Sequence, residues 1–118
     1  MPDDRSTSWR LGAMALAVAG LCLCGPAVAA DPPQIKITLK DHKFDPAEIH
    51  VKAGQPTVLV VTNQDTTPEE FDSSALHVEK VIVGGHYGVI NLHPLAAGRF
   101  PFMGEFHPGT AKGVVISE

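Results

Sequence analysis

Residues 98–110, Gly-Arg-Phe-Pro-Phe-Met-Gly-Glu-Phe-His-Pro-Gly-Thr, contain the clearest strand pattern of the chain. Phe100 and Phe102 alternate with other side chains, the period of two that is typical of a strand with one buried face. Pro101 has no backbone N–H, so we expect this strand at a sheet edge or with that nitrogen turned outward. The segment therefore predicts a strand over residues 99–104 that runs into a loop.

This loop carries two side chains of the kinds that bind metal ions. Glu105 and His107 lie two residues apart, and Gly104, which continues the inward-facing series, brings no side chain to the space beside them. A carboxylate and an imidazole held by a stiff strand can share a metal ion. By itself, such a pair more often consists of two solvated loop residues, so it leaves both interpretations open.

The first 30 residues have the composition of a secretory signal peptide. A polar segment with two arginines (1–10) precedes an apolar segment (11–23), and small residues follow (25–30). This order is typical of an export signal, and the apolar part is too short to anchor the chain in a bilayer. We predict a cleaved signal peptide over residues 1–30, a mature domain over residues 31–118 and a periplasmic location.

The mature segment has no cysteine, because Cys22 and Cys24 both lie in the predicted signal peptide, without a convincing lipid-attachment sequence before them. A small exported domain without disulfides must be stabilised by the packing of its sheets, helped by any bound metal ion. The net charge of the chain is −4. A chain without a basic patch is not expected to bind nucleic acid.

Six further segments of the mature chain have the pattern of short strands: 35–39, 46–51, 58–62, 76–83, 86–92 and 111–117. The segment 58–62 is apolar on both faces, as a central strand of a sandwich is. No helical periodicity extends beyond one turn. Seven to eight short strands, with turns about every 8–12 residues, predict an all-β Greek-key sandwich of two sheets.

Three sequence patterns along the mature chain together resemble the cupredoxin family. They are Phe44-x-Pro46 followed by Ile49-x-Val51-x-Ala53-Gly54, then Val61-x-Asn63-x-Asp65, and finally Gly98-x-Phe100-x-Phe102. Each pattern is short, but their order and spacing resemble the family over residues 34–118. The resemblance implies a cupredoxin-like β-sandwich.

The chain departs from this family at the metal ligands of its blue-copper members. The resemblance places the first histidine ligand near Glu69, the cysteine at Gly104 and the second histidine at His107, so only His107 is retained. A blue-copper centre needs a thiolate together with two imidazoles. The mature segment has no thiol, which excludes a type 1 copper centre.

Within the cupredoxin-like proteins, residues 67–72 and 104–108 resemble the EfeO-type domains, small exported proteins associated with ferrous-iron uptake through an iron permease. This resemblance implies a periplasmic accessory of iron uptake that binds iron or copper. Non-enzymatic metal binding is the favoured interpretation, and ferrous oxidase activity stays open.

On the fold that the resemblance implies, the loop after the central strand and the loop after the phenylalanine-rich strand meet at one pole. This brings Glu69 or Glu70 near Glu105 and His107. We predict Glu70, Glu105 and His107 as metal ligands, with Glu69 as a fourth ligand or as a group that orients them. An oxygen-rich set of this kind suits iron, manganese or copper(II) better than copper(I).

Two further residues extend the candidate metal-binding set. Met103 faces away from Phe102, and an exposed thioether near the site would favour copper(I). His86 follows a Gly-Gly turn that we expect at the same pole, whereas His93 is expected at the opposite pole. The other three histidines are expected at turns or at outward-facing strand positions: His42, His50 and His77.

Three functions remain open at this point. The first is a metal-binding module of iron uptake, the second a copper-binding or copper-trafficking protein that uses Met103 and His107. The third is a metal-free sandwich that docks on a membrane permease, in which Glu69 and Glu70 only solvate their loop. A hydrolytic enzyme is not expected, because the chain has neither a recognisable nucleophile elbow nor a histidine-rich zinc motif.

Overall fold

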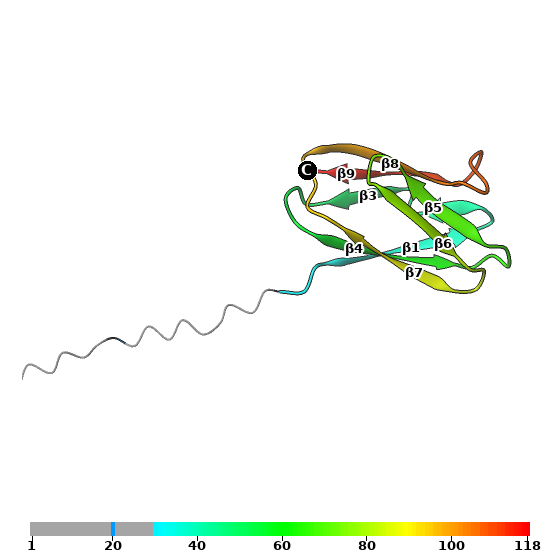
Figure 1. The fold of residues 1–118 in the computed structure, drawn as a ribbon, viewed down its shortest axis with the longest axis horizontal. Coiled ribbons are helices and arrows are strands. Elements are labelled where there is room, and N and C mark those ends of the chain that lie inside the picture. Colours follow the sequence, from blue (N-terminus) through cyan, green and yellow to red (C-terminus); the bar gives the residue numbers. More distant parts are fainter. Residues whose placement is uncertain (1–19, 21–29) are drawn as a thin grey trace, which may run out of the picture.

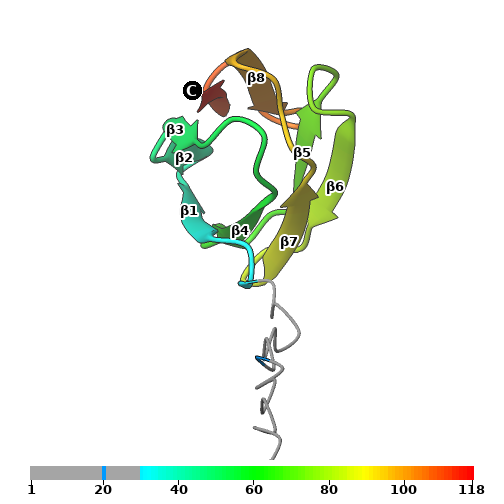
Figure 2. The ribbon, with the colours of Figure 1, turned by 90° about the vertical axis from the view of Figure 1, so that its left-hand side faces the viewer.

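The computed structural model describes Gly20 and residues 30–118, and residues 34–117 contain nine strands in two sheets. Most of the predicted signal peptide lies outside the described residues. Figure 1 shows the two sheets packed face to face, and Figure 2 shows the strands around the core. No helix within the described residues is long and apolar enough to cross a membrane.

The four-stranded sheet has the order β2-β1-β4-β7, and the five-stranded sheet has the order β3-β9-β8-β5-β6. The β1–β4 and β3–β9 pairs are parallel, and the other pairs are antiparallel. The strands are β1 (Gln34–Lys40), β2 (Lys43–Asp45), β3 (Glu48–Val51), β4 (Thr57–Asn63), β5 (Glu69–Ser73), β6 (Val78–Ile82), β7 (Tyr87–Leu92), β8 (Gly98–Gly104) and β9 (Lys112–Ser117).

The predicted all-β sandwich is confirmed, with two strands more than the seven segments expected from the sequence. One is β2, which has only three residues. The other is β5, which alternates between the core and the outer face as expected of a strand, but whose inward positions include Glu69 and Ser73. Polar residues at inward positions conceal the alternation of apolar and polar residues that predicts a strand.

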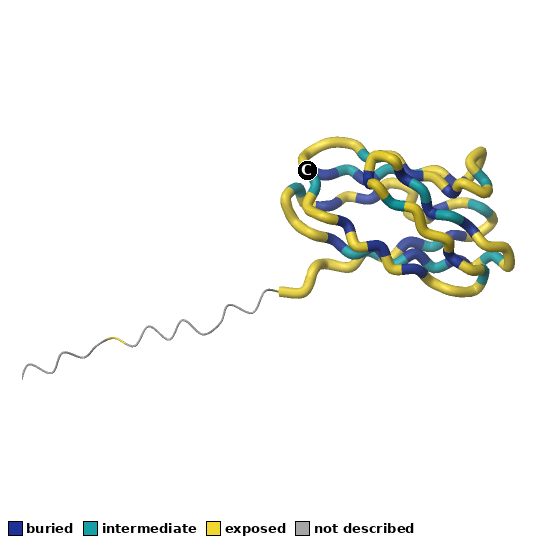
Figure 3. The backbone as a smooth tube through the Cα atoms, in the orientation of Figure 1, coloured by how far each residue is buried: buried dark blue, intermediate teal, exposed yellow. Residues whose placement is uncertain are grey.

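Three phenylalanine rings form the centre of the core between the sheets. The ring centroids of Phe71 and Phe102 lie 4.7 Å apart in a stacked arrangement. Phe44 packs edge-on against both rings, with centroid distances of 5.8 Å and 5.1 Å. Figure 3 shows the alternation of buried and exposed positions along the strands that this packing requires. The core thus joins β2, β5 and β8.

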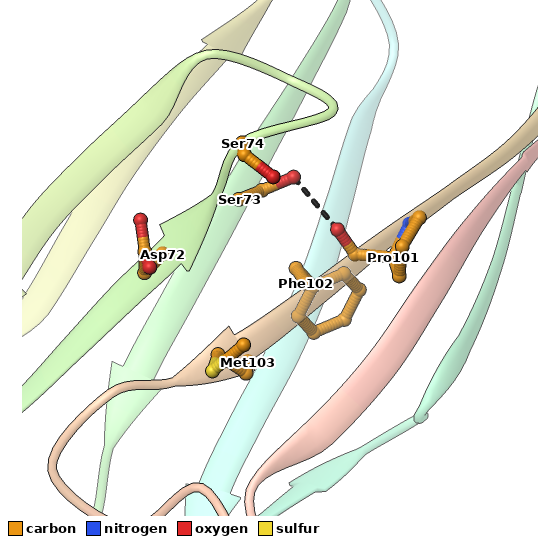
Figure 4. A pocket seen from close by; sticks show the side chains of 6 residues that line it. All are labelled: Asp72, Ser73, Ser74, Pro101, Phe102 and Met103. Carbon is orange, nitrogen blue, oxygen red and sulfur yellow. Dashed lines mark hydrogen bonds between the residues drawn. The ribbon is translucent and has the colours of Figure 1, made fainter.

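The strand β8 lies between β9 and β5 and is not an edge strand. The missing N–H of Pro101 must therefore be accommodated inside the sheet. The ladder between β5 and β8 ends at the pair Asp72 and Met103. Beyond it, the hydroxyl of Ser73 donates to the carbonyl oxygen of Pro101 at 2.7 Å, beside a small pocket of about 110 Å³ (Figure 4). The proline nitrogen therefore lies where the two strands have already separated, and no ladder hydrogen bond is lost.

Four connections gather at one pole of the sandwich, at the end opposite to the C-terminus (Figure 1). They are the β1–β2 turn (41–42), the β4–β5 loop (64–68), the β6–β7 turn (83–86) and the β8–β9 loop (105–111). We call this end of the molecule the loop pole. It places segments that are far apart in the sequence close together.

Candidate metal centre

Three side chains at the loop pole offer ligand atoms that all lie within 4.8 Å of one another: those of His42, Glu69 and His107. His42 comes from the β1–β2 turn, Glu69 is the first residue of β5, and His107 belongs to the β8–β9 loop. Both imidazoles are partly exposed and the carboxylate is buried. The three groups form a candidate metal centre with its anion on the inside and its imidazoles nearer to solvent.

The carboxylate of Glu69 is held by hydrogen bonds on both oxygens although only 1% of the residue is exposed. Its Oε1 accepts from the backbone amides of Glu70 (3.1 Å) and Phe106 (2.9 Å), and its Oε2 accepts from Nδ1 of His107. A buried carboxylate is strongly destabilising unless donors of this kind compensate it. Because these donors hold both oxygens, the carboxylate has a fixed orientation in the centre.

Gly104 makes room for this carboxylate. A Cβ atom at this position would lie 2.6 Å from the carboxyl carbon of Glu69 and 2.7 Å from Cβ of Ala111, distances that side chains do not tolerate. The resemblance to cupredoxins places the blue-copper cysteine at Gly104. In this chain, the Glu69 carboxylate fills the space that a cysteine side chain would need.

His107 is oriented by its own loop and by Glu69. Its amide donates to the carbonyl of Gly104 (3.1 Å), and its carbonyl accepts from the amide of Ala111 (2.9 Å). The hydrogen bond to Glu69 uses Nδ1 and leaves Nε2 for another partner. A metal ion between the two groups would replace this hydrogen bond, whereas an ion at Nε2 would keep it, with Glu69 orienting the ring.

His42 is the residue of this centre that the sequence did not indicate as a ligand. It was expected at a turn, where it does lie, but its ring stacks on that of His107 with centroids 3.5 Å apart and planes inclined by 13°. Its Nδ1 lies 3.4 Å from Oδ2 of Asp65 in the β4–β5 loop. The pKa of the Asp65 carboxyl is lowered, mainly because the backbone amide of His42 donates a hydrogen bond to it. The sequence predicted only that His42 lies in a turn, and nothing in it placed that turn beside His107.

Glu70 and Glu105 form a separate pair beside the centre. Side chains alternate along β5, so Glu70 faces the outer side of the sheet while Glu69 faces inward. The amide of Glu105 donates to the carbonyl of Glu70 (2.9 Å), which makes their side chains cross-strand neighbours. Loss of solvation, followed by the negative charge of Glu105, raises the pKa of Glu70. Like charges directly opposite each other weaken a sheet.

The structure places Met103 and His86 outside the three-residue group. Met103 lies on the outer face of β8, opposite Asp72 and Lys112, and is 42% exposed. His86 is exposed in the β6–β7 turn of the loop pole, where its carbonyl accepts from the amide of Asn63 (2.8 Å). Of the six predicted ligands, the structure thus brings Glu69 and His107 together.

Residues 13–117 match the cupredoxin-like domain family, and the chain belongs to this family. Over 83 residues it is 41% identical to the uncharacterized protein RP394 of Rickettsia prowazekii; the match covers 70% of this chain and 66% of that protein. The chain therefore spans just under two thirds of that relative's length.

Two solved structures show the same fold at low identity. Auracyanin A, a "blue" copper protein from Chloroflexus aurantiacus, has a TM-score of 0.64 and 15% identity, over 75% of this chain and 100% of that chain. The metal binding domain of the Cu(I) exporting P-type ATPase CopA of Streptococcus pneumoniae D39 has a TM-score of 0.62 and 20% identity, over 72% and 84% of the two chains.

The donor set fits a transition-metal ion of borderline hardness. Imidazole nitrogens suit copper, iron, zinc and nickel, and a carboxylate adds a hard anionic donor, whereas copper(I) prefers thiolate and thioether sulfur. Three protein ligands leave coordination positions for water or another small ligand. The side chains of His42, Glu69 and His107 therefore match the chemistry of a divalent ion.

Proposed function

We propose that this protein is a periplasmic metal-binding protein that holds a divalent transition-metal ion, copper(II) most tightly, through His42, Glu69 and His107. The convergence of three ligand atoms within 4.8 Å on a buried, hydrogen-bonded carboxylate is the observation that carries this proposal. A site of nitrogen and oxygen donors binds divalent ions in an order that peaks at copper(II). The export signal expected over residues 1–30 supports the location.

The copper proteins with the same fold support copper as the metal, but the donor atoms of this chain favour a different oxidation state. The described neighbours are a "blue" copper protein and a domain that holds Cu(I). The thiol-free set around Glu69 favours copper(II) over copper(I). The copper form is expected to lack the intense visible band of a copper–thiolate centre.

A second candidate is an EfeO-type accessory of iron uptake that binds ferrous iron for a membrane iron permease, with ferrous oxidase activity as its possible enzymatic side. Two imidazoles and one carboxylate form the donor set of non-haem ferrous sites. The carboxylates of Glu70 and Glu105 form an oxygen-rich pair on the outer side of the sheet at the same pole, a second place where iron could bind. This pair favours the candidate and keeps both residues in the proposed ligand set for that metal.

Calorimetric titration of the purified protein with copper(II), and anaerobically with iron(II) and copper(I), tests these proposals. Replacing His107 by alanine should weaken binding of the preferred ion at least about tenfold, the smallest loss expected for a ligand. His77→Ala, in the turn between β5 and β6, serves as the matched histidine control. Saturable binding of none of the three ions would favour the metal-free sandwich that docks on a permease.

A further inference from the structure

We propose that Asp65 is the positioning residue of this centre: it holds the imidazole of His42 over that of His107 and leaves Nε2 of His42 for the metal. The inference rests on the proposed metal binding. Its evidence lies in the backbone of the β1–β2 turn and in the contacts of one carboxylate.

The turn that carries His42 is built from two residues in an unfavourable conformation. Lys40 and Lys43 form the last pair of the β1–β2 hairpin, so Asp41 and His42 alone make the connection. Both have positive φ angles, 51° and 56°. Two-residue hairpin turns of this kind favour Asn-Gly, because glycine adopts positive φ without strain. A histidine kept at such a position is consistent with a functional role for its side chain.

The carboxylate of Asp65 contacts both backbone amides of this turn and the ring of His42. Oδ1 accepts from the amide of Asp41 (2.8 Å), and Oδ2 accepts from the amide of His42 (3.0 Å). Oδ2 also lies 3.4 Å from Nδ1 of His42. Histidine ligands of metals commonly present their other ring nitrogen to a carboxylate, which fixes the ring and its tautomer. This contact assigns Nε2 as the ligating atom.

Asp65 is itself anchored in the interior rather than on a free loop. Its amide donates to Oδ1 of Asn63 (3.0 Å), a residue with no exposed surface. The amide group of Asn63 donates in turn to the carbonyls of Thr67 (2.9 Å) and Ile82 (3.0 Å). A Cβ at Gly84 would lie 2.4 Å from the carbonyl oxygen of Thr66, so the β6–β7 turn packs directly against this loop. The buried asparagine and this packing hold the carboxylate of Asp65 against the β1–β2 turn.

The test is electron paramagnetic resonance of the copper(II)-loaded full-length protein together with its copper affinity. We expect two coordinated imidazole nitrogens in the native protein and one in Asp65→Asn, whose NH₂ group would face the donors of the turn. The affinity should fall about tenfold or more, the range for losing a group that orients a ligand. Asp45→Asn, an exposed aspartate of β2, is the matched control.

A double-mutant cycle separates positioning from a general structural effect. If Asp65 acts through His42, adding Asp65→Asn to His42→Ala should reduce copper affinity no further than His42→Ala does. In Asp41→Gly, the turn should form more readily even when the Asp65 carboxylate is removed. If Asp65 positions the ring of His42, copper(II) in D41G/D65N should still have one coordinated imidazole nitrogen fewer than in the native protein.

The possible outcomes distinguish the two proposals. Two coordinated nitrogens and native affinity in Asp65→Asn would overturn the role of Asp65 and leave the metal site intact. Native copper affinity in both His42→Ala and His107→Ala would overturn the metal site itself.

Discussion

Two histidines of this protein have the same backbone conformation but very different surroundings. His42 in the β1–β2 turn and His77 in the β5–β6 turn both have a φ angle of 56°. The amide of His77 donates to Ser74 within its own turn, whereas the amide of His42 donates to Asp65 from another loop. Only His42 stacks on His107. The strained turn at His42 is therefore part of a site, while the contacts of the turn at His77 are local.

The two histidines should differ most in their effect on copper(II) binding. Replacing His42 by alanine removes an imidazole donor and should weaken copper(II) binding at least about tenfold. Replacing His77 by alanine removes the same side chain from the same conformation and should leave the affinity unchanged. Isothermal titration calorimetry measures both. Equal losses in the two variants would mean that copper binds to surface histidines without regard to the centre.

A second prediction concerns the close packing of Gly104 against Glu69, which should affect the free energy of unfolding. Gly104→Ala would place a methyl group against the Glu69 carboxyl carbon and Cβ of Ala111. Overpacking of this kind should lower the free energy of unfolding by about 1–3 kcal/mol. Gly109→Ala is a control in the same loop, because no atom lies within 4 Å of its added Cβ. Urea denaturation of the metal-free protein gives both values, and equal stability of the variants would contradict the crowding at Gly104.

The third prediction sharpens the comparison of the two turns. Glycine at a positive φ angle removes strain, so His77→Gly should raise the free energy of unfolding by about 0.5–1 kcal/mol. His42→Gly removes the same strain but also the stacking on His107 and the contact with Asp65, and should gain less. Denaturation in urea without metal compares them. A larger gain for His42→Gly would show that its ring contacts do not stabilise the fold.

The sandwich could be predicted because its strands are largely apolar on alternate positions, whereas the site could be predicted only in part. Glu69 and His107 lie at or near positions where the cupredoxin resemblance places two blue-copper ligands, and both were among the predicted ligands. His42 could not be found, since a ligand delivered by a hairpin turn has no fixed spacing from the other ligands. The opposite directions of Glu69 and Glu70 were also hidden, because β5 was not recognised as a strand and its alternation assigns one carboxylate to each face.

The fourth prediction uses the neighbours Glu69 and Glu70. Because the pKa of Glu70 is raised in the folded protein, its ionised form destabilises the fold above the folded-state pKa. Glu70→Gln should therefore stabilise the protein at pH 7, and this gain should vanish as the pH falls below the unfolded-state pKa of about 4.3. Copper(II) affinity should stay unchanged, whereas a loss of iron(II) affinity would support the iron-uptake candidate. Thermal unfolding between pH 4 and pH 8 follows the stability.

The smallest effect is expected at a histidine away from the candidate centre. His50 faces Glu118 through Nδ1 (2.8 Å) and Glu48 through Nε2 (2.9 Å), and these contacts, that with Glu118 first, raise its pKa. Only the protonated ring donates to both carboxylates. Its contribution to stability is therefore fully present below the unfolded-state pKa of about 6.5 and is lost as the pH rises through the higher folded-state pKa.

The test of this contribution compares His50→Gln with the native protein by urea denaturation at pH 6 and pH 9. The variant should be slightly less stable than the native protein at pH 6 and equally stable at pH 9. The difference at pH 6 is small because the side chains of His50, Glu48 and Glu118 are all more than half exposed. His93→Gln, an exposed histidine in the β7–β8 connection, should show no such pH-dependent difference. A deficit of the same size at both pH values would mean that His50 stabilises the β3 edge through packing rather than through its charge.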